Sequence, residues 1–177
     1  MKTSGLIGVL SACVLLVGCD SGSEVKQAFM AKYGKDLCLE VAESFPFSIT
    51  YQNDISEAPE SRWALPLVEE GVLTEGEVME SGTPPMVLKT VSFDLSEQGR
   101  SFLQDNRLCY GKTEVDRILN TREYGESGKR FLDAQVVLMH VVTAPWAKNP
   151  ALKGQIKSGR EVVERTLRGS EDGWILH

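Results

Sequence analysis

The chain has 177 residues, of which 42% are hydrophobic and 25% are charged, a composition typical of a folded globular protein. Its formal net charge at pH 7 is −6. Binding to the phosphates of nucleic acid needs clustered lysine and arginine, so this composition argues against a nucleic-acid partner and against direct adsorption to anionic lipid.

Residues 1–18 have the features of a secretory signal peptide. Lys2 gives the start a positive charge, and residues 5–17 carry no charge, but this apolar run is too short to cross roughly 30 Å of hydrocarbon as a permanent helix. The run ends in Leu-Val-Gly-Cys at residues 16–19, which resembles the lipobox of bacterial lipoproteins. The resemblance implies cleavage before Cys19, acylation of Cys19 and anchoring to a bacterial membrane on its periplasmic face.

Residues 19–23 form a short polar tether after the expected cleavage site. In enteric-type lipoproteins an aspartate directly after the lipidated cysteine is a signal for retention in the inner membrane, and Asp20 resembles that signal. The resemblance therefore favours the inner membrane, whereas the alternative is that Asp20 is a plain solvated linker residue. Two or more acyl chains give stable anchoring, at roughly 0.8 kcal/mol per buried CH₂.

The next segment predicts a helix followed by two strands. Ser23 can cap a helix over residues 24–33, which Gly34 ends. Apolar and polar side chains then alternate over residues 37–41 and again over residues 47–51, which predicts half-buried strands.

A second helix and a strand are predicted further along. Helical spacing of apolar residues indicates a helix over 63–72, with Pro66 in its first turn. The sequence over 80–85 is typical of a loop, the alternation over 86–95 predicts a strand, and a short helix is expected over 96–104.

Residues 62–103 resemble a winged-helix module. The pattern Leu-x-x-Val-x-x-Gly-Val-Leu at 65–73 is similar to a helix that leads into a two-stranded wing, and Asp-Leu-Ser-Glu-Gln-Gly-Arg at 94–100 is similar to the turn that closes the wing. No recognition helix can be identified, and an exported acidic protein has no chromosome to bind, so the resemblance implies a scaffold. The alternative is an amphipathic helix followed by an ordinary hairpin.

The remainder of the chain predicts a mainly antiparallel sheet. Strands are expected over 114–121, 131–142, 160–167 and 174–176, with turns at 124–129 and 169–173. The run 131–142 is apolar on both faces, which is typical of a central strand covered on both sides. The closing Asp-Gly-Trp turn resembles the end of NTF2-like and other small exported α+β domains, a likeness that implies a fold and no activity.

The sequence therefore predicts an α+β fold with a signal peptide (1–18), a tether (19–23) and two subdomains. The first, over 24–105, is expected to hold the N-terminal helix and the winged-helix-like part. The second, over 106–177, is expected to hold the antiparallel sheet.

The chain has four cysteines, and their positions limit which disulfides can form. Cys13 leaves with the signal peptide and Cys19 carries lipid, so Cys38 and Cys109 remain in a compartment that oxidises thiols. A Cys38–Cys109 disulfide is the simplest interpretation. The alternatives are a metal pair, which would need two more ligands in a chain poor in histidine, and a redox pair, which usually has Cys-x-x-Cys spacing.

We assign no catalytic residue, metal site or cofactor from the sequence. His140 lies within the apolar run, which favours a hydrogen-bonded core histidine over a group that lines a pocket, and His177 is the last residue. Trp146 follows Pro145 on a bend, so it is the better candidate to line a ligand groove, and the alternative is a core tryptophan.

The expected function is binding of a partner protein, a small ligand or an envelope component by a tethered, non-enzymatic domain. The alternative is an envelope hydrolase that uses two carboxylates for acid–base chemistry, which does not need histidine. Two carboxylates in a deep cleft, one of them in an apolar setting, would favour the enzyme.

Overall fold

The computed structural model describes residues 21–171 and 173–176 and has the α+β fold that the sequence predicts. The helices are α1 (Ser21–Tyr33), α2 (Ser61–Glu69) and α3 (Glu97–Arg100), with short 3₁₀ helices η1 (Ile55–Glu57), η2 (Pro145–Lys148) and η3 (Pro150–Leu152). The strands are β1 (Asp36–Leu39), β2 (Phe47–Tyr51), β3 (Leu73–Thr83), β4 (Met86–Leu95), β5 (Leu103–Gln104), β6 (Arg107–Glu126), β7 (Lys129–Val142), β8 (Gly159–Ser170) and β9 (Gly173–Leu176).

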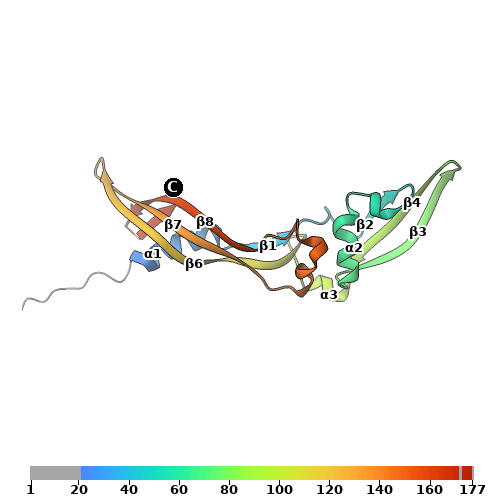
Figure 1. Ribbon diagram of the computed structural model, residues 1–177, viewed down its shortest axis with the longest axis horizontal. Helices are drawn as coiled ribbons and strands as arrows, with labels where there is room; N and C mark the ends of the chain where they lie inside the picture. The colour runs from blue at the N-terminus through green and yellow to red at the C-terminus, as the bar shows by residue number, and fades with distance from the viewer. Residues whose placement is uncertain (1–20, 172, 177) are drawn as a thin grey trace, which may run out of the picture.

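A large antiparallel sheet forms one end of the elongated molecule (Figure 1). Its strands follow the order β1-β6-β7-β8-β9, and β5 pairs with the start of β6. The pairing of β6 with β7 shifts register twice, between Val115 and Arg117 and between Ile118 and Asn120, so that β6 holds two extra residues. Bulges of this kind bend a strand and increase its twist, which accounts for the curl of the sheet.

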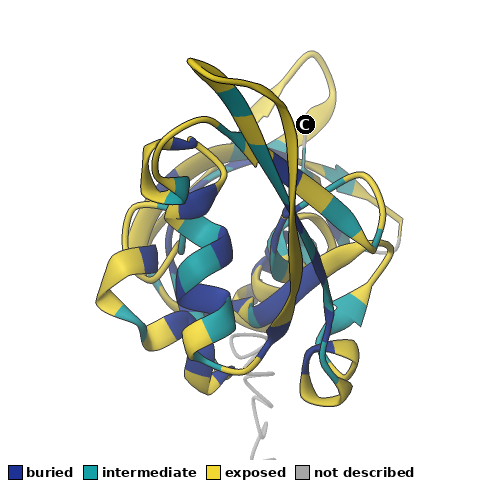
Figure 2. Ribbon diagram, turned by 90° about the vertical axis from the view of Figure 1, so that its right-hand side faces the viewer, coloured by how far each residue is buried: buried dark blue, intermediate teal, exposed yellow. Residues whose placement is uncertain are grey.

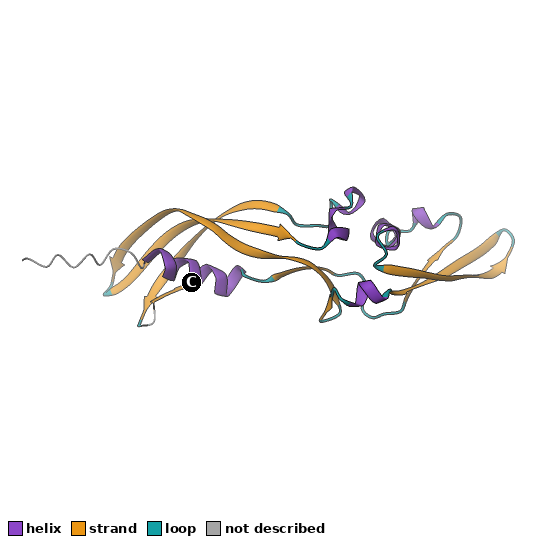
Figure 3. Cartoon of the chain, turned by 90° about the horizontal axis from the view of Figure 1, so that it is seen from below, coloured by secondary structure: helices purple, strands orange, loops and turns teal. Residues whose placement is uncertain are grey.

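Helix α1 lies beneath the arch of these strands (Figure 3). Val25 and Phe29 are four residues apart, so they share one helix face, and both are fully buried against the sheet. Burial on this scale contributes about 1.5–3 kcal/mol for each side chain. The N–H of Gly34 bonds to the carbonyl of Met30, which ends the helix where the sequence predicts.

Strand β7 lies in the middle of the large sheet, as its apolar sequence predicts, but only one of its faces is covered. Val136 and Leu138 are buried on the face that carries α1. On the outer face Val137 is buried, yet its neighbour in register, Val162, is 56% exposed. The expectation of cover on both sides is wrong, because among the described residues α1 packs on one face only and Val162 is exposed on the other.

A smaller antiparallel sheet with the order β2-β4-β3 forms the other end. Its inner face carries Val91 and Phe93, which are fully buried together with Ala64 and Leu67 of α2. Strand β4 has the bounds that the sequence predicts. The β3–β4 hairpin extends beyond this core as the far tip of the molecule (Figure 1).

Three expected helices differ in extent from the observed ones. Helix α1 begins at Ser21 and not at Glu24, so Ser23 lies inside the helix and the expectation that it caps the helix is wrong. Helix α2 begins at Ser61, whose buried hydroxyl donates to the Ala58 carbonyl at 2.6 Å, so Pro66 lies inside the helix and not in its first turn. Helix α3 begins after Ser96, as expected, and the Ser96 hydroxyl accepts from the N–H of Gly99 at 2.9 Å. It stops at Arg100 because β5 leaves the helix to pair with β6.

Two expected loops are largely strand. Residues 80–83 continue β3, and only Pro84 and Pro85 make the turn. Residues 124–126 likewise continue β6, because Ser127 and Gly128 both adopt positive φ and form a two-residue hairpin turn. Longer strands result in both places.

The division into 24–105 and 106–177 does not match the way the chain packs. Helix α1 packs on the sheet of the second region, and β1 pairs with β6 of that region. In the other direction, Trp146 and Leu152 are buried in the core of the first region. The two cores therefore exchange segments, since each needs apolar side chains from both parts of the chain. Among the helices of residues 21–171 and 173–176, none is long and apolar enough to cross a membrane.

Candidate functional site

The predicted lipid site, Cys19, and the sorting residue, Asp20, lie outside the described residues. Helix α1 begins at Ser21, only two residues after Cys19. Lipidation of Cys19 and the inner-membrane signal at Asp20 therefore stay predictions.

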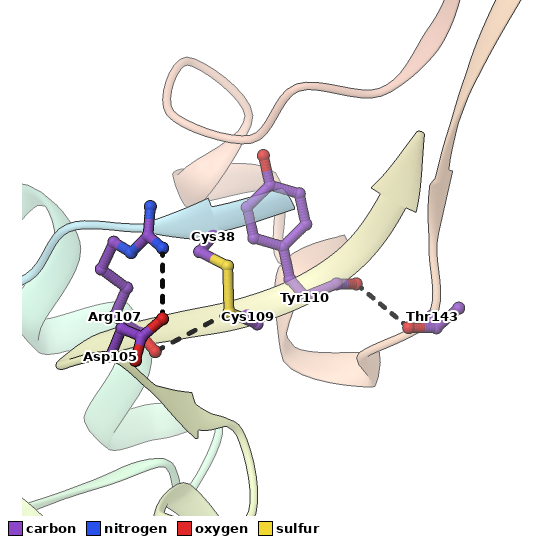
Figure 4. The surroundings of a disulfide bond; sticks show 6 residues. All are labelled: Cys38, Asp105, Arg107, Cys109, Tyr110 and Thr143. Atoms are coloured by element: carbon purple, nitrogen blue, oxygen red, sulfur yellow. Dashed lines mark hydrogen bonds and ion pairs between the residues drawn. A yellow bond between two sulfur atoms is a disulfide. The ribbon is translucent and has the colours of Figure 1, made fainter. Parts of the chain in front are cut away.

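The predicted disulfide between Cys38 and Cys109 is confirmed, with an S–S distance of 2.03 Å. The two residues face each other in the register of β1 and β6, and Figure 4 shows the bond joining these strands between Arg107 and Tyr110. Strand β1 has only four residues and pairs with β6 alone. Few hydrogen bonds hold this short edge strand in the sheet, and the disulfide adds a covalent link to β6.

Trp146, the predicted ligand-lining residue, is a core side chain. It is 1% exposed, and its ring packs edge-on against Phe102 at 6.0 Å and Tyr110 at 5.9 Å between centroids. Pro145 does place it on a bend, in η2, but the bend turns the indole inward. Its Nε1 has no hydrogen-bond partner among the described residues.

His140 is a buried, hydrogen-bonded residue that joins three strands, which agrees with the core interpretation. It is 6% exposed, and its Nδ1 lies 3.0 Å from the hydroxyl of Thr113 on β6. Its Nε2 lies 3.1 Å from the carboxylate of Glu161 on β8, to which Lys157 donates at 2.8 Å. Because Thr113 is also buried, its hydroxyl does not face a substrate, and the geometry is that of a structural bridge.

Hydrogen bonds from Lys157 and His140 lower the pKa of Glu161 below its ordinary value of 4.5, against the opposing effect of desolvation. A carboxyl group with a lowered pKa in the folded state adds stability above pH 4.5, and this contribution is lost as the pH falls through the folded pKa. The Glu161 side chain is 46% exposed, so we expect Glu161→Gln to cost about 0.5 kcal/mol at neutral pH. In urea unfolding, the difference from wild type should shrink as the pH falls below 4.5 and disappear below the folded pKa of Glu161.

Glu164→Gln is the matched control for this prediction. Glu164 lies on the same strand and is exposed, and its carboxylate forms no ion pair within the described part of the chain. The variant should show no pH-dependent loss of stability. An equal loss in both variants would contradict the role assigned to the Glu161 contacts.

The hydrolase alternative needs paired carboxylates in an apolar cleft. A surface depression of about 620 Å³ is lined by Glu40, Glu43, Asp105 and Arg107, but all three acids are exposed. The Asp105 side chain is 91% exposed. None of these carboxyls has the apolar setting that raises the pKa of a general acid, so this depression does not match the expected arrangement. Neither His140 nor Trp146 lines it.

The most unusual surface lies at the tip of the β3–β4 hairpin. Met79, Met86 and Leu88 are 64%, 70% and 45% exposed. Met79 is paired with Thr90, so it shares a face with Leu88 and Met86, opposite to the face of buried Val91. We call Met79, Met86 and Leu88 the tip patch. Figure 2, viewed from this end, shows the hairpin largely exposed.

Acidic side chains lie on the same hairpin as the tip patch. Glu75, Glu77 and Glu80 are exposed on β3. Glu75 and Glu80 share the face of Val91, opposite to the tip patch, and Lys89 lies 3.7 Å from Glu80 on that face. Residues 80–85 have the sequence of a loop, so the sequence did not predict this surface. The alternation over 86–95 was the available signal, since it places Met86 and Leu88 on the face opposite to Val91 and therefore away from the core.

Helix α2, the β3–β4 hairpin and the turn at Ser96 follow one another in the order that the winged-helix resemblance implies. That resemblance, and the likeness to NTF2-like domains, stay predictions. No protein-family model matches the chain, and no curated protein or solved structure matches it.

Proposed function

We propose that this chain is a bacterial lipoprotein that acyl chains on Cys19 anchor to the inner membrane, facing the periplasm, and that it binds a partner protein through the tip patch. The lipobox-like sequence at residues 16–19 supports the anchor. The tip patch supports the binding activity and is the observation that carries the proposal.

Three large apolar side chains share one exposed face at the tip. Single exposed apolar residues are common on protein surfaces, whereas a contiguous group of them marks an interaction site. Ser81 and Thr83 complete this face of β3, so the surface around Met79 carries no charge. Methionine side chains are flexible and polarisable, which lets them pack against a partner of irregular shape.

The neighbouring charges indicate what kind of partner fits. The exposed acids Glu75, Glu77 and Glu80 outnumber the base Lys89, so the hairpin that carries the tip patch has a net negative charge. Complementary charge steers association and disfavours wrong partners. We therefore expect a partner protein with an apolar surface bordered by lysine or arginine, and not a second copy of this acidic chain.

The start of α1 and the β3–β4 hairpin lie at opposite ends of the molecule (Figure 1), because α1 packs on the large sheet and the hairpin extends from the small one. A lipid anchor confines the chain to the membrane surface and raises its effective concentration for a partner in the same envelope. Modest affinity at the tip patch is then sufficient for function.

Photo-crosslinking in cells of the native host tests the binding proposal. A photoreactive residue at Met86 should give one discrete adduct, whereas the same residue at Leu119, which is 46% exposed on β6, should not. Met79→Glu together with Leu88→Glu should lower the yield at position 86 at least about tenfold, because a buried contact residue contributes roughly 1–2 kcal/mol or more. The folded state should be unaffected, since both residues point to solvent.

Val162→Glu is the control, because it also replaces an exposed apolar strand residue with glutamate but lies in the other sheet. It should leave the adduct at position 86 unchanged. Identical adducts at positions 86 and 119, or an adduct that survives the double substitution, would contradict the proposal.

A further inference from the structure

A row of four side chains crosses the large sheet at the end where α1 begins. The strand register places Tyr124 of β6 opposite Phe131 of β7, Phe131 opposite Arg168 of β8, and Arg168 opposite Ile175 of β9. The rings of Tyr124 and Phe131 stack at 5.6 Å between centroids. We call these four residues the outer row.

The outer row lies on the face of the sheet away from α1. Leu132 and Leu167 are buried in the core that contains α1, and side chains alternate between the two faces of a strand. Phe131 and Arg168, their neighbours in the chain, therefore point to the uncovered face. Ile175 is 60% exposed and Arg168 is exposed, so the row is open to a partner.

The outer row also lies close to the point where the anchor joins the fold. Gly173 precedes Ile175 by two residues on the β8–β9 hairpin, and a Cβ placed on Gly173 would lie 3.6 Å from the Glu24 carboxyl group. Glu24 belongs to the first turn of α1. Ser21 follows Cys19 by two positions, and two chain steps span at most about 7 Å. A lipid on Cys19 therefore holds this end of the sheet within a short distance of the bilayer.

We infer that the outer row rests on the lipid headgroup surface of the membrane that holds the Cys19 anchor. This inference depends on the proposed lipidation. Tyrosine and phenylalanine suit the headgroup layer, where one part of a side chain is apolar and the surroundings are wet, and Arg168 can donate to lipid phosphate. The row contains no acidic residue.

The tether limits the contact to this end of the sheet. Helix α1 packs on the opposite face, and the two chain steps from Cys19 to Ser21 span at most about 7 Å. A lipid on Cys19 therefore does not reach a bilayer that covers the whole outer face. The molecule then stands with the β3–β4 hairpin directed away from the membrane, which leaves the tip patch free for a partner.

Fluorescence quenching on vesicles tests this orientation. The lipidated full chain carries one new cysteine, at Ile175, Val162 or Leu88, which are 60%, 56% and 45% exposed. Each is labelled with an environment-sensitive fluorophore while Cys38 and Cys109 stay in their disulfide. The vesicles contain phosphatidylethanolamine and phosphatidylglycerol with a spin-labelled lipid as quencher.

We expect strong quenching at position 175 and none at position 88. Quenching at position 162 should be at least about fivefold weaker than at 175, because six residues of strand between Val162 and Arg168 span roughly 20 Å, beyond the headgroup layer of about 5–8 Å. Arg168→Glu should at least halve the quenching at 175. Arg117→Glu, the same charge change elsewhere on the outer face, should leave it unchanged.

The intact mass of the same samples separates the two proposals. Suppose the mass shows that Cys19 is acylated. If position 175 is then not quenched, or if all three positions are quenched equally, the proposed orientation is wrong, but the lipoprotein proposal stands. A mass without acyl chains overturns both.

Discussion

Trp146→Ala should lower the free energy of unfolding by about 3–5 kcal/mol, the range found when a fully buried aromatic side chain is truncated in a core. Trp146 is 1% exposed and fills the space between Phe102 and Tyr110. Its removal leaves a cavity beneath the 3₁₀ helix η2 (Pro145–Lys148). Urea unfolding followed by circular dichroism measures the loss without relying on tryptophan fluorescence.

Two further variants show whether the loss comes from packing. Trp146→Phe keeps a ring in the core and removes an N–H that has no partner among the described residues, so it should cost much less than alanine. Leu88→Ala truncates a side chain that is 45% exposed and should change stability by no more than about 0.5 kcal/mol. If Trp146→Ala were as mild as Leu88→Ala, Trp146 would not be a core residue.

Removal of the disulfide should cost about 4 kcal/mol. Cys38 and Cys109 are 71 residues apart in the chain, and opening a loop of this length restores conformational entropy to the unfolded state. The Cys38→Ser, Cys109→Ser double variant should therefore unfold at lower urea concentration. Strand β1 should also exchange its amide hydrogens faster, because the bond to β6 holds its four residues at the edge of the sheet.

The single variants are the controls for this result. Each one breaks the same cross-link, so Cys38→Ser and Cys109→Ser should each lose nearly as much as the double variant. Losses that add up in the double variant would instead mean that the two side chains act through separate packing contacts. Two free thiols in the non-reduced wild-type protein would contradict the disulfide itself.

Local signals in the sequence predicted several elements with near-correct bounds. Helix α1 ends at the residue before Gly34, and strand β4 covers residues 86–95, because capping and alternation depend on side chains a few residues apart. Ser96 was identified as the start of α3 for the same reason. Errors of extent arose where pairing with a distant strand continued an element, as at residues 80–83 and 124–126.

Local signals in the sequence could not predict the outer row or the tip patch. The outer row exists only because the registers of β6, β7, β8 and β9 align Tyr124 with Ile175, and the β6–β7 register depends on two bulges. A shift of one residue in any pairing would turn these side chains to the opposite face. The tip patch depends likewise on the pairing of Met79 with Thr90.

The sequence by itself determined the α+β class, the pairing of the two remaining cysteines and the buried character of His140, because composition, cysteine number and an apolar run constrain each of these directly. Tertiary structure alone decided that α1 packs on the C-terminal sheet, that Trp146 points into a core and that the tip patch points to solvent. Periodicity shows that a residue has an apolar side but does not show which distant segment covers that side. Only long-range packing makes that choice.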